Sequence, residues 1–320
     1  MRERWTRTTP VLQVGEDEAA ELLAPALGAV RIEALVPLGG GHSNTNIRVK
    51  LSSPPHNVVL RLYQHDPAQA RKEAAITRLV SKSVPVPHYH YVGERVSDGW
   101  TYAVVDFVEG ETLQSMAERA GESELSAAGE SVGSVLAAIH AFTFEQAGFL
   151  DGDLKVTPFA GGFSSVAYLQ SCFSGIAGER IGRELAEGVI AFARKNEGRS
   201  DAWNNPPRLT HFDFGGTNIL MRNDGTVAGV VDWEYAAAAS PAADFGNLLR
   251  PPLGAMPAFV RGVEQGYHRG GGMLPDDWRA LTRIADLGAW AEFMTRSNVS
   301  EQLIEDARTM LRETIFSDSP

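Results

Sequence analysis

The chain has 320 residues, and its 40 acidic and 29 basic side chains give a formal net charge of −11. This length can bury a sizeable core in one large domain or in two, and the acidic balance argues against a general nucleic-acid binder. The single cysteine, Cys172, excludes an intrachain disulfide and fits a reducing cytoplasm, and the lack of any apolar stretch of about 18 residues disfavours secretion and a membrane partner.

The N-terminal part begins with an amphipathic helix, which the pattern predicts near residues 17–27. Arg31 to Leu38 alternate in polarity as a strand, and Thr45 to Leu51 form the returning strand. The turn between them, Gly39-Gly40-Gly41-His42-Ser43-Asn44, is rich in glycine. Its backbone N–H groups can approach phosphate oxygens without obstruction by side chains. The turn therefore predicts either a phosphate-covering hairpin or a plain surface loop.

A third strand is predicted over residues 57–63, in which Arg61 is the one cation among apolar residues. A helix follows over residues 66–80, with Asp66 as its N-cap. A guanidinium can bind phosphate through two bonds and can also pair with a carboxylate. We expect Glu73, one of few acids on the helix, to orient Arg61 toward phosphates. The alternative is that both side chains are solvated surface charges.

Strand signals end near residue 110. Strands are predicted near residues 88–96 and 100–108, and the chain then leaves the sheet. Helical periodicity dominates beyond this point, over residues 123–142, 275–288 and 301–316. The sequence therefore predicts two units, an N-terminal one over residues 1–110 and a C-terminal one over residues 111–320.

A polar loop followed by a short hairpin is the most informative segment of the C-terminal unit. Residues 219–222 and 226–231 are short apolar strands, and Asn223-Asp224-Gly225 between them is a strong turn signal. An antiparallel hairpin places the start of its first strand beside the end of its second. Asn218 and Asp232 should therefore lie side by side, with Asp213 on the loop just before them.

These three side chains suit phosphoryl transfer. The Asn218 amide and the Asp232 carboxylate are hard oxygen ligands of the kind that binds Mg²⁺ on nucleotide phosphates. Asp213 can accept the proton of an incoming alcohol as catalytic base. Asp and Asn also cap turns in many loops, but their order and spacing with a hairpin between them favour the functional interpretation. His211, two residues before the base, is expected to anchor the loop by hydrogen bonding.

This segment resembles the catalytic loop of the protein-kinase-like superfamily, in which His-x-Asp is followed by Asn five positions after the Asp, the spacing from Asp213 to Asn218. The closer resemblance is to the aminoglycoside phosphotransferase and choline kinase branch. That branch follows its metal-binding Asp with Trp-Glu or Phe-Glu, as Asp232-Trp233-Glu234 does here. Phe212 departs from the family, because glycine is usual at that position.

The resemblance implies a bilobal α+β fold of the protein-kinase-like type. Its N-terminal lobe would hold an antiparallel sheet with a helix, and its larger C-terminal lobe would be mainly helical. It also implies Mg²⁺ and a phosphoryl donor, ATP or GTP, as cofactors. The residues implied at the nucleotide are Gly40, Gly41 and Ser43 over the phosphates and Asp106, Phe107 and Val108 at the base.

The chain lacks the long activation segment of protein kinases, which ends in Ala-Pro-Glu. Instead, Asp232 is soon followed by Pro241-Ala242-Ala243-Asp244. A small-molecule acceptor is therefore favoured over a peptide. The family resemblance continues in this Pro-x-x-Asp segment, where we expect Asp244 to be an N-cap that braces the catalytic loop.

The sequence thus predicts a phosphotransferase that moves the γ-phosphoryl group of a nucleoside triphosphate to a hydroxyl of a small molecule. The acidic chain favours an aminoglycoside-like or other cationic acceptor. A choline- or ethanolamine-type kinase, a sugar kinase and a non-catalytic nucleotide-binding regulator of the same fold are the alternatives. Candidate acceptor contacts, each of which can equally be a core or solvent-facing residue, are Asp276, Asp277, Trp278, Trp290, Glu292 and Glu305.

Overall fold

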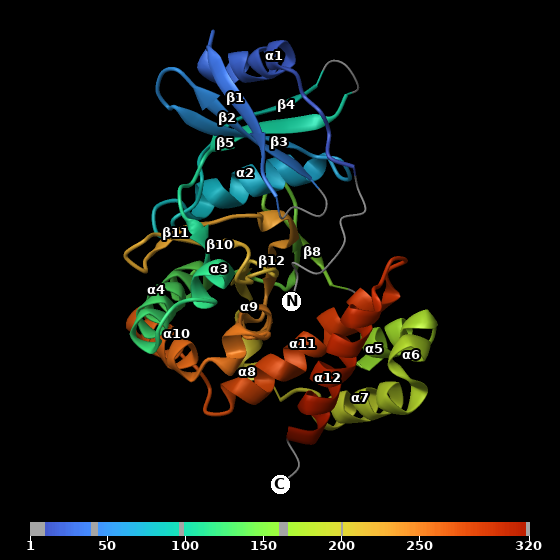
Figure 1. Cartoon of the computed structure of the whole chain (residues 1–320). Coiled ribbons are helices and arrows are strands. Elements are labelled where there is room, and N and C mark those ends of the chain that lie inside the picture. Colours follow the sequence, from blue (N-terminus) through green and yellow to red (C-terminus); the bar gives the residue numbers. More distant parts are fainter. Residues whose placement is uncertain (1–9, 40–43, 96–98, 160–165, 200, 318–320) are drawn as a thin grey trace.

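The structure, a computed structural model, describes residues 10–39, 44–95, 99–159, 166–199 and 201–317. It has two lobes, with a strand-rich lobe above a mainly helical one in Figure 1. The chain passes from the upper lobe to the lower one directly after β5. The expected mixed α+β fold, with an antiparallel sheet in its N-terminal lobe, is confirmed.

The N-terminal lobe is a five-stranded antiparallel sheet in the order β1-β2-β3-β5-β4. Its elements are α1 (Glu16–Leu27), β1 (Ile32–Pro37), β2 (Thr45–Leu51), β3 (Asn57–Leu62), α2 (Ala68–Val80), β4 (Tyr89–Glu94) and β5 (Thr101–Asp106). The helix α1 covers the outer face of the sheet, and α2 lies between the sheet and the lower lobe (Figure 1). The predicted elements are all present, and the bounds predicted for β2 match those of the structure.

The alternation along β3 decides which of its side chains face the lower lobe. Val58, Leu60 and Leu62 are fully buried in one apolar cluster with Leu22 and Leu23 of α1. Successive side chains of a strand point to opposite faces, so Arg61 faces α2 instead. The guanidinium of Arg61 is therefore on the face of the sheet that is directed toward α2 and the lower lobe.

The start of α2 is capped as predicted. The carboxylate of Asp66 accepts the backbone N–H of Ala68 at 2.9 Å. Pro67 already has helical torsion angles, and its lack of an N–H costs nothing there, because the first N–H groups of a helix have no partner within the helix. The helix then runs to Val80, where it was predicted to end.

The C-terminal lobe is mainly helical, with two small antiparallel sheets of order β11-β10-β6 and β8-β7-β12-β9. Only the β10–β11 hairpin among these was predicted. The elements are β6 (Glu111–Thr112), α3 (Leu113–Ala117), α4 (Glu122–His140), β7 (Gly148–Leu150), β8 (Val156–Pro158), α5 (Val166–Phe173), α6 (Ile176–Ile181), α7 (Arg183–Lys195), α8 (Asp201–Asn204), β9 (Arg208–Thr210), β10 (Ile219–Met221), β11 (Val227–Val230), η2 (Trp233–Tyr235), β12 (Ala237–Ala239), α9 (Pro241–Leu248), η3 (Leu253–Ala255), α10 (Pro257–Arg269), α11 (Trp278–Thr295) and α12 (Glu301–Ser317).

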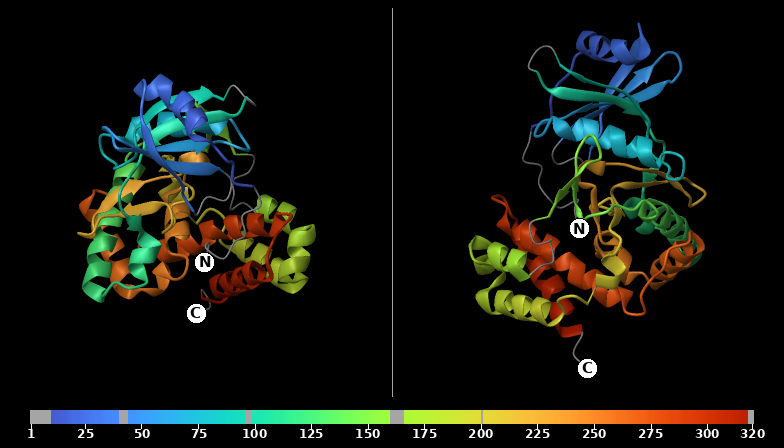
Figure 2. Two further views of the ribbon diagram at one scale, coloured as in Figure 1. Left: turned by 45° about the horizontal axis from the view of Figure 1, so that its top comes forward. Right: turned by 180° about the vertical axis from the view of Figure 1, so that it is seen from behind.

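Two apolar clusters stabilise this lobe. The larger one joins α4, α9 and α10 to the β10–β11 hairpin, and the smaller one joins α5, α6, α7, α11 and α12. Figure 2 shows the second group as a separate helical layer beside the first. The helix α11 is longer than predicted, and it contributes Trp278 to the larger cluster and Trp290 to the smaller. It therefore links the two parts of the lobe.

The predicted boundary at residue 110 stays a prediction. Strand β6 begins directly after this boundary and pairs with β10 of the lower lobe, which is compatible with the prediction. Within the described ranges, every helix is too short or too polar to cross a bilayer.

Candidate active site

The catalytic hairpin has the predicted geometry. Strands β10 and β11 pair antiparallel with Ile219 opposite Val230, and the N–H of Val231 donates to the carbonyl oxygen of Asn218 at 3.0 Å. Asn218 thus lies beside Val231, the residue directly before Asp232. The sequence interpretation of a hairpin that brings residues 218 and 232 together is confirmed.

Asp213 is held by Asn218. Its side chain is buried, and the Nδ2 group of Asn218 donates to both the carbonyl oxygen and the Oδ2 atom of Asp213, at 2.9 and 3.0 Å. These bonds fix the orientation of the Asn218 amide. Its Oδ1 atom therefore points away from Asp213, as an amide oxygen that ligates a cation must.

Asp244 braces the catalytic loop, although not as a helix cap. The cap of α9 is Ser240, whose hydroxyl accepts the N–H of Ala242 at 3.2 Å. The expectation of an N-cap at Asp244 is wrong, because Ser240 precedes Pro241 and supplies the cap. The buried Asp244 carboxylate instead accepts the backbone N–H groups of His211 and Phe212, at 2.9 and 2.8 Å.

Phe212 adopts a left-handed backbone conformation, with φ of +65°. Glycine adopts this conformation more readily than any residue with a Cβ atom. The ring of Phe212 stacks on Phe159 at a centroid distance of 6.0 Å and meets Phe149 edge-on at 6.4 Å. These contacts with the β7–β8 hairpin offset the strain at Phe212.

His211 anchors the loop, as predicted. Its Nε2 atom donates to the carbonyl oxygen of Val231 at 2.9 Å, and its ring lies 4.6 Å from that of Trp233. The imidazole is fully buried and ties the loop of Asp213 to the segment that carries Asp232.

Arg61 bridges the two lobes through a pair of carboxylates. One of its terminal nitrogens lies 2.8 Å from Glu73 on α2 and 2.5 Å from Asp232 in the lower lobe. Glu73 is completely buried and Arg61 is nearly so. The alternative that both are solvated surface charges is therefore wrong, and the expected ion pair is present.

Two tyrosines that the sequence analysis did not identify complete the environment of Glu73. The hydroxyls of Tyr63 and Tyr89 donate to its Oε2 atom at 2.6 and 2.5 Å. Burial raises the pKa of Glu73, and the charge of Arg61 opposes this rise. The carboxylate is thus fixed by three donors and cannot rotate away from Arg61.

Glu234 makes two further links to the upper lobe. Its Oε2 atom accepts the side-chain N–H of Asn44 at 3.1 Å, and its carbonyl oxygen accepts Nζ of Lys72 at 2.8 Å. Burial, followed by the charge of Asp232, raises the pKa of Glu234 to about 8. The sequence analysis predicted neither of these two hydrogen bonds, although it identified Asn44 as the end of the glycine-rich turn and Glu234 as the last residue of the Asp-Trp-Glu motif.

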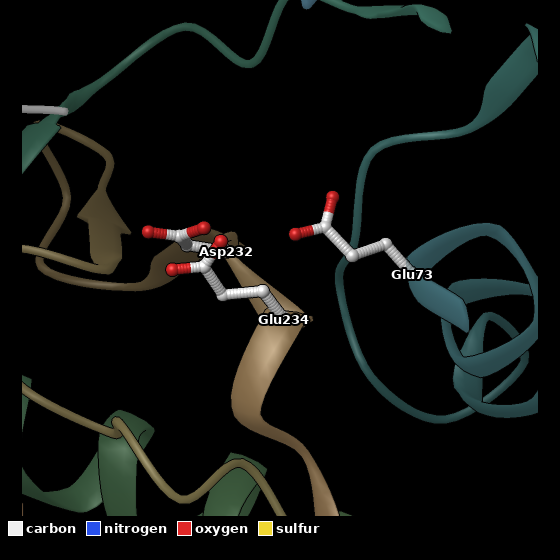
Figure 3. A group of neighbouring side chains, drawn as sticks. All are labelled: Glu73, Asp232 and Glu234. Carbon is white, nitrogen blue, oxygen red and sulfur yellow. The ribbon is translucent and has the colours of Figure 1, made fainter. Parts of the chain in front are cut away.

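The carboxylates of Glu73, Asp232 and Glu234 converge from both lobes (Figure 3), with oxygens within 4.8 Å of one another. Asn218 and Asp232 supply an amide oxygen and a carboxylate, which is the donor set that Mg²⁺ prefers. The site therefore fits the implied metal, and the oriented amide of Asn218 is the observation that supports this fit.

Asp106 is held at the end of β5. Its N–H donates to the carbonyl oxygen of His88 at 2.9 Å, and its carboxylate contacts the ring of His90 at 2.7 Å. The N–H of Asp106 is therefore committed to the sheet, so donors to a base would come from Phe107 or Val108. The ring of Phe107 lies under the guanidinium of Arg48, at 4.0 Å. Gly40, Gly41 and Ser43 lie outside the described residues.

Most of the candidate acceptor contacts are core residues or paired acids, whereas Asp276 is exposed. Trp278 and Trp290 are buried in the two clusters, as their alternative interpretation as core residues has it, and Trp290 also lines a small pocket beside the loop of Asp213. Glu292 bonds twice to Arg296, at 3.1 and 2.8 Å. Asp277 pairs with Arg199 and Glu305 with Arg308. A cationic acceptor would compete with these arginines.

Comparisons with known proteins agree with this fold. The sequence profile of the phosphotransferase enzyme family matches residues 34–283, which is most of the chain. Among solved structures, the aminoglycoside phosphotransferase APH(4)-Ia superposes with a TM-score of 0.70 at 19% identity, over 96% of this chain and 100% of that one. A search of curated proteins found no relative by sequence.

Two solved complexes are also similar. One is a thermostable mutant of APH(4)-Ia with ADP and hygromycin B, with a TM-score of 0.69 and 20% identity over 95% of this chain and 99% of that one. The other is the GDP and kanamycin complex of APH(2")-IIia, with a TM-score of 0.71 and 18% identity over 94% of this chain and 99% of that one.

The chain belongs to the phosphotransferase enzyme family. It has the protein-kinase-like fold, and the family is one of phosphotransferases.

Proposed function

We propose that this protein transfers the γ-phosphoryl group of a nucleoside triphosphate to a hydroxyl of a small molecule, with Asp213 as catalytic base. The observation that carries the proposal is the placement of Asp213. It is buried, oriented by Asn218 and attached through the β10–β11 hairpin to Asp232. A carboxylate so placed can accept the proton of an incoming alcohol.

Each remaining residue has a distinct part in this proposal. Arg61, positioned by Glu73, binds phosphate oxygens of the donor. Asn218 and Asp232 hold Mg²⁺, which neutralises charge on the phosphates when it is bound. Asp244 and His211 keep the catalytic loop in place through the hydrogen bonds described above. Asp213 accepts the hydroxyl proton at a carboxylate oxygen as the acceptor oxygen approaches the phosphorus.

The donor is ATP or GTP. Similar structures contain ADP in one case and GDP in another, so both bases remain candidates. We propose that Gly40, Gly41 and Ser43 cover the phosphates and that the backbone from Asp106 to Val108 binds the base. The N–H groups of Phe107 and Val108 would serve as the donors, because that of Asp106 already bonds to His88.

An aminoglycoside-like compound is the leading acceptor. Hygromycin B and kanamycin are bound in the two similar complexes, and the net charge of −11 favours a cationic molecule. Choline, ethanolamine and neutral sugars are the alternatives. Because Glu292 is paired with Arg296, fewer acidic side chains are available to bind a cationic acceptor, and a neutral sugar is therefore also a candidate acceptor. The expected cytoplasmic location rests on the single cysteine and stays a prediction.

A non-catalytic regulator is the second candidate function. Two departures from related sequences suggest it: Phe212 stands where the family usually has glycine, and Arg61 stands on the strand where protein kinases have lysine. Arg61 makes the ion pair with Glu73, and Phe212 adopts a conformation that glycine favours, so neither substitution distorts the site. Asp213, Asn218 and Asp232 are also all retained. These observations favour the enzyme.

An acceptor panel distinguishes the two functions. The purified protein is incubated with Mg-ATP or Mg-GTP and kanamycin, hygromycin B, choline, ethanolamine or glucose, and phosphorylated products are measured by mass spectrometry. Product formed from any acceptor supports the enzyme. Tight nucleotide binding without product from any of them favours the regulator.

A further inference from the structure

A small pocket lies directly against the loop that carries Asp213. Its lining includes Gln114, Gly215, Thr217, Asn247, Arg250 and Trp290. Asn247 also donates from its side chain to the carbonyl oxygen of Phe212 at 3.1 Å, so this wall is tied to the catalytic loop. The pocket volume of about 40 Å³ has room for one functional group rather than a ring.

Arg250 is the only charged side chain on the pocket wall among the described residues. Its Nε atom and one terminal nitrogen bind Asp286 at 3.1 and 2.5 Å, and both side chains are about nine-tenths buried. The guanidinium also lies 5.1 Å from the ring centroids of Trp290 and Phe293. These contacts hold the guanidinium rigidly, so that it can offer a fixed N–H donor to the pocket.

A buried ion pair seldom stabilises a fold more than apolar residues of similar size would, because both charges must leave water. The position of Arg250 on a pocket wall next to the catalytic loop indicates that this ion pair takes part in ligand recognition. Asp286 is committed to Arg250, and no acidic side chain lines the pocket within the described part of the chain. The other polar groups of the wall, from Gln114, Thr217 and Asn247, are neutral. A cationic substituent would thus meet Arg250 without a compensating carboxylate.

We propose that this pocket is an acceptor subsite in which Arg250 binds an oxygen substituent, a hydroxyl or a carboxylate, of the molecule that is phosphorylated. This inference rests on the phosphotransferase function proposed above and deepens it. The acceptor places one non-cationic oxygen group in the pocket and a second hydroxyl at Asp213. Any amino groups that the acceptor carries lie outside this subsite.

Three sugars that differ only at carbon 6 test the proposal: glucose, glucuronate and 6-amino-6-deoxyglucose. Their binding is measured by ligand-observed NMR in the presence of Mg²⁺ and a non-hydrolysable ATP analogue. The variant is the double substitution Arg250→Gln with Asp286→Asn, which removes both charges and leaves neither buried alone. The matched control is Arg269→Gln with Glu130→Gln, at an exposed ion pair between α10 and α4. Thermal melting shows whether each variant is folded.

The parent and the control are expected to bind glucose or glucuronate about tenfold more tightly than the amino sugar, the size expected for a hydrogen bond to a charged group. The variant should lose this preference. Tighter binding of glucuronate than of glucose would identify a carboxylate as the group that Arg250 binds. Tighter binding of glucose would identify a hydroxyl. Equal or better binding of the amino sugar by the parent would overturn the proposal. Retention of the preference in a folded variant, or no binding of any of the three sugars, would also overturn it.

Phosphorylated product is measured in parallel, so that the two proposals can fail separately. A clear preference without product from any acceptor would leave Arg250 as the binding site of an oxygen substituent and would contradict the phosphotransferase function. Phosphorylated product without a preference for glucose or glucuronate over the amino sugar would support the phosphotransferase function and contradict the Arg250 subsite.

Discussion

Arg61 and Asp232 are 171 residues apart in the sequence, yet a terminal nitrogen of Arg61 lies 2.5 Å from Oδ1 of Asp232. This contact joins the sheet of the upper lobe to the proposed metal ligand of the lower lobe. Asn44 and Lys72 make the two neighbouring links, both to Glu234. The segment from Asp232 to Glu234 therefore holds the proposed phosphate-binding residue Arg61 next to the proposed metal ligand Asp232.

The first prediction separates these two parts. Asp232→Asn should abolish the increase in nucleotide affinity that Mg²⁺ produces, because it removes the charged ligand. Arg61→Lys should weaken nucleotide binding yet keep the response to Mg²⁺, because it retains the charge but not the planar two-bond geometry. Titration calorimetry with and without Mg²⁺ measures both effects. Parent-like binding of Mg-nucleotide by both variants would show that the site is misplaced.

The second prediction concerns the left-handed backbone at Phe212. Both Phe212→Gly and Phe212→Ala remove the ring contacts with Phe149 and Phe159, but only glycine relieves the strain of the positive φ. The free energy of unfolding of the glycine variant should exceed that of the alanine variant by about 1 kcal/mol. Denaturant unfolding of the two proteins provides the comparison. Equal stabilities would mean that the backbone at this position is not strained.

The third prediction concerns pH and Glu234. Burial and Asp232 raise the pKa of Glu234 from its ordinary 4.5 to about 8, so the folded state binds the proton more tightly than the unfolded state. The stability that this proton contributes is complete below about pH 4.5 and is lost as the pH rises toward 8. Relative to Glu234→Gln, which carries no titrating group, the metal-free parent should therefore lose stability between pH 5 and pH 8.

Melting temperatures of the parent and Glu234→Gln, taken across this range without Mg²⁺, test the third prediction. The difference between the two proteins is the quantity of interest, because carboxylates remote from Glu234 titrate equally in both and cancel. A difference that does not change with pH would contradict the raised pKa.

Local sequence patterns were sufficient to predict the strands of the N-terminal sheet, the β10–β11 hairpin and the helices α1, α2, α4, α11 and α12, but not α5, α6, α7 or α10. The alternation from Thr45 to Leu51 and the turn at residues 223–225 determine strands whose partners are close in sequence. Arg61 could be identified because it is a lone cation in an apolar strand, and Glu73 because it is one of few acids on the helix that follows. Such assignments need only periodicity and nearest neighbours.

Contacts between distant segments could not be predicted in this way. The links from Asn44 and Lys72 to Glu234 span 190 and 162 residues, and no periodic pattern encodes them. Asp244 was expected to brace the catalytic loop as an N-cap. It does brace the loop, but through two hydrogen bonds that depend on how α9 packs against β9 and that no local pattern predicts. The tryptophans of α11 were ambiguous for the same reason, since core and pocket positions share one helical spacing.

The most direct test of the account is the rate of phosphoryl transfer by Asp213→Asn. Turnover with the best acceptor of the panel and nucleotide affinity are both measured, in the variant and in the parent. The account predicts unchanged nucleotide affinity and a turnover lower by about 100- to 10,000-fold, the usual contribution of a positioned acid–base group. A folded variant with near-parental turnover would contradict the assignment of Asp213 as the catalytic base.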